Sequence, residues 1–124
     1  MFISLQMNIL TIMKKSQDLP DCNVSTTIRV LSSKWKIYII QILEKNPMQF
    51  SEFISAIDGI SKNVLSQTLR SMVEDGIIEK KIFPEIPYPH IGYGLSHIGI
   101  TLIPVLKEME KWGHFYKNYI QYKK

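Results

Sequence analysis

Residues 60–76 read ISKNVLSQTLRSMVEDG, and this stretch decides the fold expected of the whole chain. Its apolar side chains recur with the i, i+4, i+7 and i+8 spacing that places them on one face of an α-helix: Leu65, Leu69, Met72 and Val73. The opposite face collects polar side chains at i, i+3, i+4 and i+7: Asn63, Ser66, Gln67 and Arg70. Amide, hydroxyl and guanidinium groups on one helical face have the chemistry that reads base edges in DNA. An ordinary surface helix also carries a polar face, so the flanking segments have to decide.

The composition is that of a single globular domain. With 124 residues, of which 45% are hydrophobic and 21% charged, the chain can bury a core without disulfides or metal ions. Fifteen Lys and Arg side chains against eleven Asp and Glu give a net charge of +4, which fits an anionic partner without requiring one. Because Arg29 and Arg70 are the only arginines, a bidentate guanine contact from residues 60–76 has to come from Arg70.

The single cysteine and the first residues bear on the compartment. Cys22 has no partner for a disulfide within the chain, which predicts a cytoplasmic protein. The sequence holds no run of about eighteen apolar residues, so no membrane partner is expected. Residues 1–15, MFISLQMNILTIMKK, carry their lysines after the apolar run and predict an amphipathic helix rather than a signal peptide. Met13 could equally be the biological start, which would make residues 1–12 an extension.

Two helices are predicted between this segment and the central stretch. Residues 16–23 are polar and predict a connection, with Asn23 a possible N-cap of a helix over 24–31. Serines at 32 and 33 interrupt that helix, and a second one is expected over 34–43. The second helix is apolar on most sides and is predicted to be buried, with Trp35 as a core anchor.

The segments next to residues 60–76 predict a winged helix. Ser51 can cap a third helix that runs through residue 57, and Asp58 with Gly59 makes a tight turn into the Ser61 cap. Two helices joined by a short turn containing Gly form a helix-turn-helix, whose second helix enters the major groove. Gly76 is expected to end that helix. Residues 77–83 and 91–95 then have the composition of two strands, joined by the proline-rich tip PEIPYPH.

The C-terminal region returns to a helical period from residue 96. Apolar residues alternate steps of four and three over about three heptads, as in a coiled-coil seam: Ile98, Leu102, Val105, Met109, Trp112, Tyr116 and Tyr119. Pro104 predicts a bend near residues 99–102. We expect this seam to be the interface of a homodimer, joined by the N-terminal helix, because a monomer would leave it exposed. The alternative is that the seam folds back on the three-helix core.

Several phrases occur in order along most of the chain: Cys22 before the first helix, KW at 34–35, QFSEF at 49–53, GISKNVLSQTLRSMVEDGII at 59–78, FPEIPYPHIGYGLSHIG at 83–99 and LIPVLKEMEKWG at 102–113. Together they resemble the HxlR-type family of small bacterial winged-helix transcription regulators, which are related to the MarR group. The resemblance implies a mostly α fold with a small β-hairpin and terminal dimerisation helices. It also implies a homodimer that binds double-stranded DNA at an inverted-repeat operator.

Departures from the family pattern change the expected contacts. Ser32 and Ser33 stand where the family usually has two glycines. His90 and Gly92 stand where the wing usually carries Arg and Glu, which leaves Lys80 and Lys81 as the basic contributors. An acidic residue after the second strand is replaced by His97, so the cap of the last helix is less certain.

These patterns give a set of expected segments and sites. The segments are an N-terminal helix over 1–15, a winged-helix domain over 16–113 and a dimerisation helix over 97–124. The expected interface of the dimer comprises Leu102, Val105, Met109, Trp112, Tyr116 and Tyr119. The expected DNA contacts are Ser61, Lys62, Asn63, Ser66, Gln67, Arg70, Lys80, Lys81 and His90.

Cys22 is the candidate sensor, because the resemblance implies that some members respond to oxidants or electrophiles through a cysteine near this position. A helix N-terminus favours the reactive thiolate. A small, half-buried cysteine without a redox role is the equal alternative.

Other classes of function find less support. The three histidines at 90, 97 and 114 lack metal-ligand spacing, so neither a metal nor a cofactor is expected. An enzyme is disfavoured, because no phosphate-binding glycine loop or nucleophile and base occur in a recognisable phrase. The remaining alternative is a winged helix that binds protein instead of DNA, which the four basic against three acidic side chains of residues 61–83 would fit.

Overall fold

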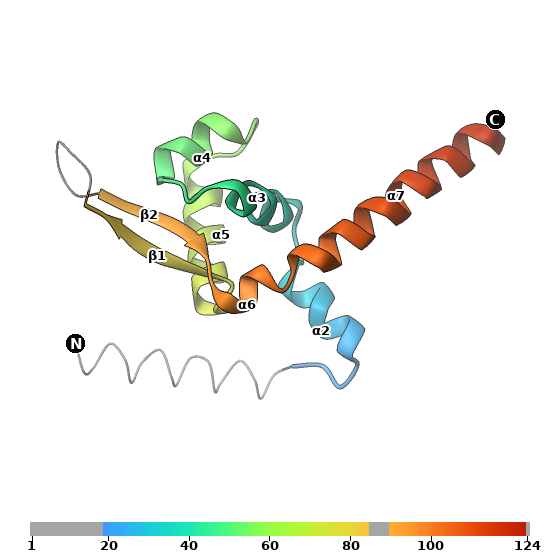
Figure 1. Ribbon diagram of the computed structural model, residues 1–124, viewed down its shortest axis with the longest axis horizontal. Helices are drawn as coiled ribbons and strands as arrows, with labels where there is room; N and C mark the ends of the chain where they lie inside the picture. Colours follow the sequence, from blue (N-terminus) through green and yellow to red (C-terminus); the bar gives the residue numbers. More distant parts are fainter. Residues whose placement is uncertain (1–18, 85–89, 124) are drawn as a thin grey trace.

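The computed structural model describes residues 19–84 and 90–123 (Figure 1). The predicted helix over 1–15 and most of the proline-rich tip lie outside these ranges. The fold is mostly helical with one two-stranded antiparallel sheet, as the sequence predicts. No helix of the described ranges is long and apolar enough to cross a membrane. In chain order the elements are α2 (Asn23–Val30), α3 (Lys34–Lys45), α4 (Phe50–Ala56), α5 (Lys62–Glu74), β1 (Ile78–Phe83), β2 (His90–Leu95), α6 (His97–Ile100) and α7 (Ile103–Lys123).

Two predicted helix starts are wrong by one or two residues. Asn23 is the first residue of α2, and Cys22 takes the N-cap position. The cap of α4 is Gln49, so Ser51 lies inside the helix. The Gln49 N–H donates to the Glu52 carboxylate over 3.1 Å, which satisfies a backbone donor that a start at Ser51 would leave outside the helix. The sequence predicted Ser51 as the cap, and the reciprocal pair between Gln49 and Glu52 places the start of α4 two residues earlier.

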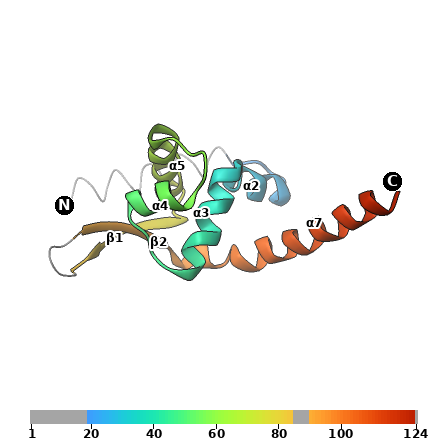
Figure 2. The ribbon, with the colours of Figure 1, turned by 90° about the horizontal axis from the view of Figure 1, so that it is seen from above.

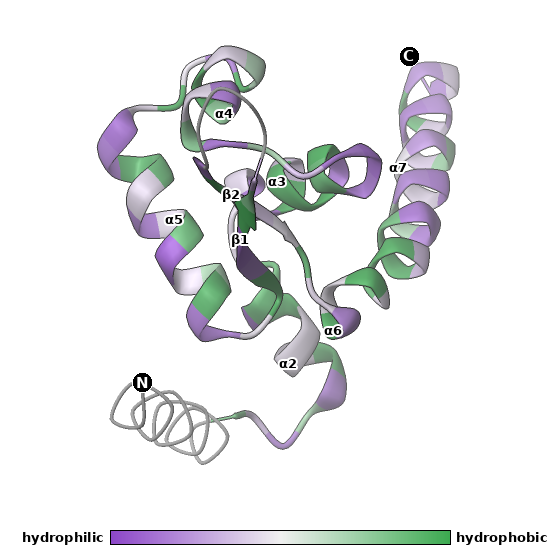
Figure 3. Ribbon diagram, turned by 60° about the vertical axis from the view of Figure 1, so that its left-hand side comes forward, coloured by the Kyte–Doolittle hydropathy of each residue, from purple (hydrophilic) through white to green (hydrophobic). Residues whose placement is uncertain are grey.

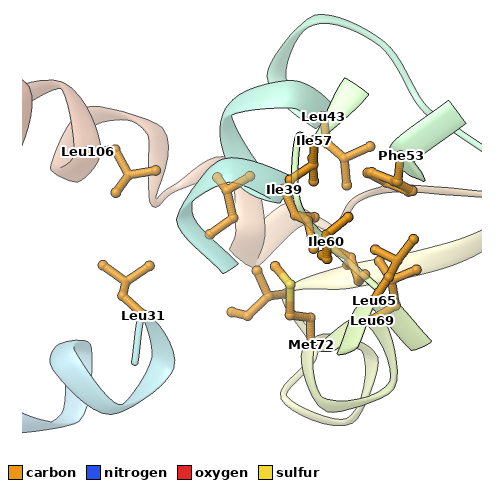
Figure 4. Close-up of a cluster of buried hydrophobic side chains, with 13 residues drawn as sticks. Leu31, Ile39, Leu43, Phe53, Ile57, Ile60, Leu65, Leu69, Met72 and Leu106 are labelled. Atoms are coloured by element: carbon orange, nitrogen blue, oxygen red, sulfur yellow. The ribbon is translucent and has the colours of Figure 1, made fainter. Parts of the chain in front are cut away.

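The hydrophobic core lies where α3, α4 and α5 meet the base of the sheet (Figure 4). Its fully buried side chains include Ile39 and Ile40 of α3 and Phe53 of α4. The predicted apolar face of α5 completes the core with Leu65, Leu69 and Met72, each at most 1% exposed, and half-buried Val73 packs against them. In Figure 3 apolar and polar residues alternate around α5, as expected for a helix with one buried face.

The first and last helices add a smaller part to the same core. Leu31, just after α2, and Leu106 of α7 point toward one another beside the main cluster (Figure 4). Val24 and Ile28 of α2 remain 67% and 62% exposed, although the sequence groups them with Leu31 on one stripe. Trp35 is half-buried and packs against the core, with its ring edge toward Tyr38 at 6.1 Å between centroids.

Gly76 ends α5 as predicted. Its φ of +78° is a backbone conformation that side chains with a Cβ rarely adopt. The Gly76 N–H donates to the Val73 carbonyl and the Ile77 N–H to the Met72 carbonyl, both over 3.0 Å. These two bonds form a Schellman motif, which directs the chain from α5 into β1.

Ser96 joins the end of α5 to α6, the helix that follows the wing, which is formed by β1 and β2. Its hydroxyl donates to the carbonyl oxygens of Gly76, at 2.6 Å, and Ile77, at 2.9 Å, and accepts the Gly99 N–H over 3.0 Å. Ser96 thereby caps α6, the cap that the substitution at His97 left open. A Cβ at Gly99 would collide with the Ile77 carbonyl oxygen, so the two backbones are in direct contact.

The predicted C-terminal helix is broken into α6 and α7. The break at residues 101–102 falls in the range where Pro104 predicts a bend. The C-terminal part of α7 runs away from the rest of the molecule (Figures 1 and 2). The predicted seam therefore stays open in one chain: Val105, Met109, Trp112, Tyr116 and Tyr119 are 38–63% exposed. Of the apolar side chains in this region, Leu102, Ile103 and Leu106 pack against the core.

Candidate nucleic-acid interface

Helix α5 presents the predicted polar face to solvent. Gly59, with φ +84°, makes the turn from α4, and the Ser61 hydroxyl accepts the Val64 N–H over 3.1 Å to cap α5. The cap leaves the Ser61 hydroxyl proton free to donate to a phosphate. The start of a helix favours anions, because its backbone N–H groups and dipole point outward. The other predicted helix contacts are all exposed: Lys62, Asn63, Ser66, Gln67 and Arg70.

The sheet divides the two wing lysines. In the register of β1 and β2, Lys80 pairs with Tyr93 and Lys81 with Gly92. Successive side chains of a strand point to opposite faces, so Lys80 and Lys81 cannot lie side by side. Lys80 points to the face next to α5. Lys81 lies on the other face and crosses Gly94, where an added Cβ would come within 2.8 Å of the Lys81 Cε.

His90 is held in the wing by an aromatic contact. Its ring stacks on Phe83 with 5.2 Å between centroids and 17° between planes. A Cβ at Gly92 would collide with the Phe83 ring, so the glycine makes room for this stack. His90 therefore shares a face with Lys81, away from α5.

A small cavity of about 180 Å³ lies between α5 and the wing. It brings together four polar or charged side chains and one tyrosine ring from elements that are apart in the sequence. Sequence reasoning assigned neither Glu74 nor Tyr93 to the interface. Their proximity depends on the strand register, which no local pattern in the sequence contains. The lining residues are Ser66, Arg70, Val73, Glu74, Lys80 and Tyr93.

Cys22 is exposed at the N-cap of α2. The backbone N–H of Ser25 is the largest of the effects that lower the pKa of the Cys22 thiol below its ordinary value. The Ser25 side chain and the Val24 N–H act in the same direction, and the small effect of burial opposes them. The thiol forms no side-chain cap hydrogen bond of ordinary geometry, so we attribute the shift to the nearby donors of the first turn. The half-buried cysteine of the alternative reading is not observed.

Comparison with known proteins identifies the family. A family model described as HxlR-like helix-turn-helix matches residues 30–121. The chain belongs to the HxlR-like family. It is thus a transcription regulator with a helix-turn-helix DNA-binding fold, a class that does not ordinarily carry catalytic activity. Among the described residues of this HxlR-like regulator, no three His, Cys, Asp or Glu side chains are grouped to hold a metal ion.

Relatives of this HxlR-like regulator include one curated protein and two solved structures that cover most of its length. YdeP of Bacillus subtilis strain 168, an uncharacterized HTH-type transcriptional regulator, is 33% identical over 85% of this chain and 81% of its own. A MarR-family regulator from Enterococcus faecalis V583 has a TM-score of 0.70 at 28% identity, over 79% of this chain and 88% of that one. The redox regulator HypR in its reduced form has a TM-score of 0.71 at 27% identity, over 81% of this chain and 98% of that one.

Proposed function

We propose that this regulator binds DNA sequence-specifically as a homodimer at an inverted-repeat operator. The exposed polar face of α5, fixed by a buried apolar face, is the observation that carries this proposal. Lys62, Asn63, Ser66 and Gln67 occupy the first half of α5, the part of a recognition helix that reaches base edges. Asn and Gln can pair with adenine through two hydrogen bonds. Ser61, Lys81 and His90 would contact the DNA backbone alongside.

A second copy of the chain is the partner that fits the open seam. Residues 97–124 carry it, and Trp112 and Tyr116 stack on one another there with 5.2 Å between ring centroids. A groove of about 710 Å³ between α2, α3 and α7 continues the seam toward the core, and apolar side chains such as Val24, Ile28 and Met109 line it. Large aromatic side chains are enriched at protein interfaces and are costly to leave in water. In a two-fold dimer the two α5 helices would lie about 34–36 Å apart, one turn of duplex.

Cys22 would make this regulator responsive to oxidants or electrophiles. The lowered pKa of its thiol and its exposure favour the reactive thiolate, and a redox regulator has the same fold. Adding the thiolate to a quinone forms one carbon–sulfur bond while the ring takes up a proton. Oxidation would end in a sulfenic acid or a disulfide between subunits.

A mobility-shift titration tests DNA binding. The full chain is titrated against the DNA upstream of its own coding sequence and a scrambled duplex of equal length, at two salt concentrations. We expect tighter binding to the upstream DNA and weaker binding at high salt, because phosphate contacts release counterions. A Gln67→Ala variant should lose preference for the upstream DNA, whereas Gln121→Ala, at an exposed position of α7, should not. Absent or salt-insensitive binding favours the alternative, a winged helix that binds protein.

The sensor role needs its own measurement. Treatment with a quinone or an oxidant should change the affinity for the upstream DNA, and Cys22→Ser should remove the response while binding DNA normally. An affinity that treatment leaves unchanged rules out the sensor role.

A further inference from the structure

Two cations from separate elements border the small cavity between α5 and the wing, which we call the notch. Arg70 reaches it from the ninth of thirteen positions in α5, and Lys80 reaches it from β1. Both side chains are exposed. The Glu74 carboxylate borders the same space, so two positive charges stand against one negative charge there. The excess of positive charge favours an anion in the notch.

The walls of the notch are fixed relative to one another. Tyr93 exchanges two backbone hydrogen bonds with Met48, of 2.9 and 2.7 Å, and its ring meets Phe53 edge-on at 6.2 Å between centroids. Lys80 is the cross-strand partner of Tyr93 and shares this fixed position. On the other side, the Ser96 hydroxyl ties the end of α5 to the base of the sheet. Little reorganisation is then needed when an anion enters.

The size and chemistry of the notch suit a single phosphate group. A water molecule takes up roughly 30 Å³ of the liquid, so about 180 Å³ holds a few waters or one tetrahedral anion. An arginine fork donates two parallel hydrogen bonds to phosphate, a lysine adds a point charge, and the Ser66 hydroxyl can donate as well.

We infer that the notch binds one backbone phosphate of the DNA, held jointly by Arg70 and Lys80. This inference rests on the proposed DNA binding and assigns Arg70 a role other than the guanine contact that the sequence predicts. Base reading then depends on the first half of α5, and the notch fixes the angle between helix and wing on the duplex. A phosphate contact positions the protein without carrying sequence information.

Glu74 is expected to oppose phosphate binding in the notch, whereas Arg70 and Lys80 favour it. Its carboxylate also lines the notch and repels an incoming phosphate. Neutralising it with Glu74→Gln should therefore tighten binding to every duplex, by roughly two- to fivefold, since one nearby charge acts partly through solvent.

Paired variants test the joint site, with Lys81 as the matched control. Arg70→Ala, Lys80→Ala, Lys81→Ala and the double variants Arg70→Ala/Lys80→Ala and Arg70→Ala/Lys81→Ala are titrated as full chains. Upstream DNA and the scrambled duplex are used at several salt concentrations. Arg70→Ala and Lys80→Ala should each weaken both duplexes equally, by roughly tenfold, because each removes a charged hydrogen bond to phosphate.

Coupling between the variants is the decisive measurement. The Arg70→Ala/Lys80→Ala variant should lose much less than the product of its single losses, because both side chains serve one phosphate. It should also lower the salt slope by about one unit. The variant that combines Arg70→Ala with Lys81→Ala should lose the full product, because Lys81 lies on the other face of the sheet. Arg70→Lys should keep most of the affinity, since lysine also binds phosphate.

Three outcomes would overturn the inference. A product-like loss in Arg70→Ala/Lys80→Ala means that the two side chains act apart. Loss of preference for the upstream DNA in Arg70→Ala alone, with Arg70→Lys no better, means that Arg70 reads a base. With either of these two outcomes, the proposed function stands as long as the wild-type chain binds the upstream DNA. A wild-type chain that binds neither duplex overturns the proposed function, and the notch with it.

Discussion

The wing and the C-terminal helix both project from the same three-helix core, but they are held in different ways. The wing is fixed by contacts within one chain, through the Ser96 hydroxyl and the bridge between Met48 and Tyr93. Among the described residues, the first part of α7 is held by buried Leu106, by half-buried Ile103 and by the ion pair of Lys107 with Glu44 at 3.4 Å. The wing exposes charged groups together with Ile82 and Ile91, whereas α7 exposes an aromatic stripe. The wing is packed at its base within one chain, and the stripe of α7 is uncovered.

Removing the aromatic stripe of α7 should have the largest effect, on both dimer formation and DNA affinity. Trp112→Ala with Tyr116→Ala should abolish the dimer in sedimentation velocity, since each buried interface aromatic contributes about 2–4 kcal/mol. Affinity for the upstream DNA should fall more than a hundredfold, because each half-site would then bind alone. Lys111→Ala is the control, because Lys111 pairs with Glu108 on the exposed surface of α7, a contact worth at most about 1 kcal/mol. A double variant that stays dimeric would contradict the proposed interface.

Substitutions at two glycines, one beside the wing and one in α7, should have effects of intermediate size on stability. Gly99→Ala should lower the free energy of unfolding by about 1–3 kcal/mol, because the new Cβ pushes against the Ile77 carbonyl and loosens α6 from the wing. Gly113→Ala in α7 should raise it by about 0.5–1 kcal/mol, since the space around Gly113 is open and alanine favours a helix. Urea titration of both variants at equal protein concentration measures the difference. If both substitutions changed the free energy of unfolding in the same direction, either the tight packing at Gly99 or the open space at Gly113 would be wrong.

The smallest expected effect is a shift in the pH dependence of alkylation at Cys22, whose helix borders the seam. Because its pKa is lowered, the alkylation rate should reach half its maximum at a lower pH than for free cysteine. Ser25→Ala should move this midpoint part of the way back up, since the larger effect of the Ser25 N–H remains. The pH profile of iodoacetamide alkylation gives both values. A midpoint equal to that of free cysteine would remove the physical basis of the proposed sensor.

Local patterns predicted most of the elements but not all of their ends. The period of residues 60–76 identified the buried face of α5, and glycines at 59 and 76 marked its flanking turns. The starts of α2 and α4 were misplaced because several neighbouring polar residues can each cap a helix. A cap depends on which reciprocal hydrogen bond forms, and the spacing of residue types does not settle it.

The candidate site was predicted less completely than the fold. The exposure of the α5 contacts follows from periodicity, but Lys80 and Lys81 were both expected to contact DNA from the wing, with no distinction between them. The strand register separates them and brings Lys80 to Arg70, beside a tyrosine and a glutamate that no motif singled out. The roles of these side chains in DNA binding remain predictions.

The helix-turn-helix, the wing, the bend before α7 and an apolar seam all follow from local patterns, because these depend on residue spacing and on the conformations of glycine and proline. Three other features come from the packing of the folded chain: α7 leaves the core with the seam uncovered, the two wing lysines lie on opposite faces of the sheet, and the Gly76–Ser96 contacts hold α5 against the wing. Each of these depends on contacts between residues far apart in the chain, and such contacts exist only once the core has formed.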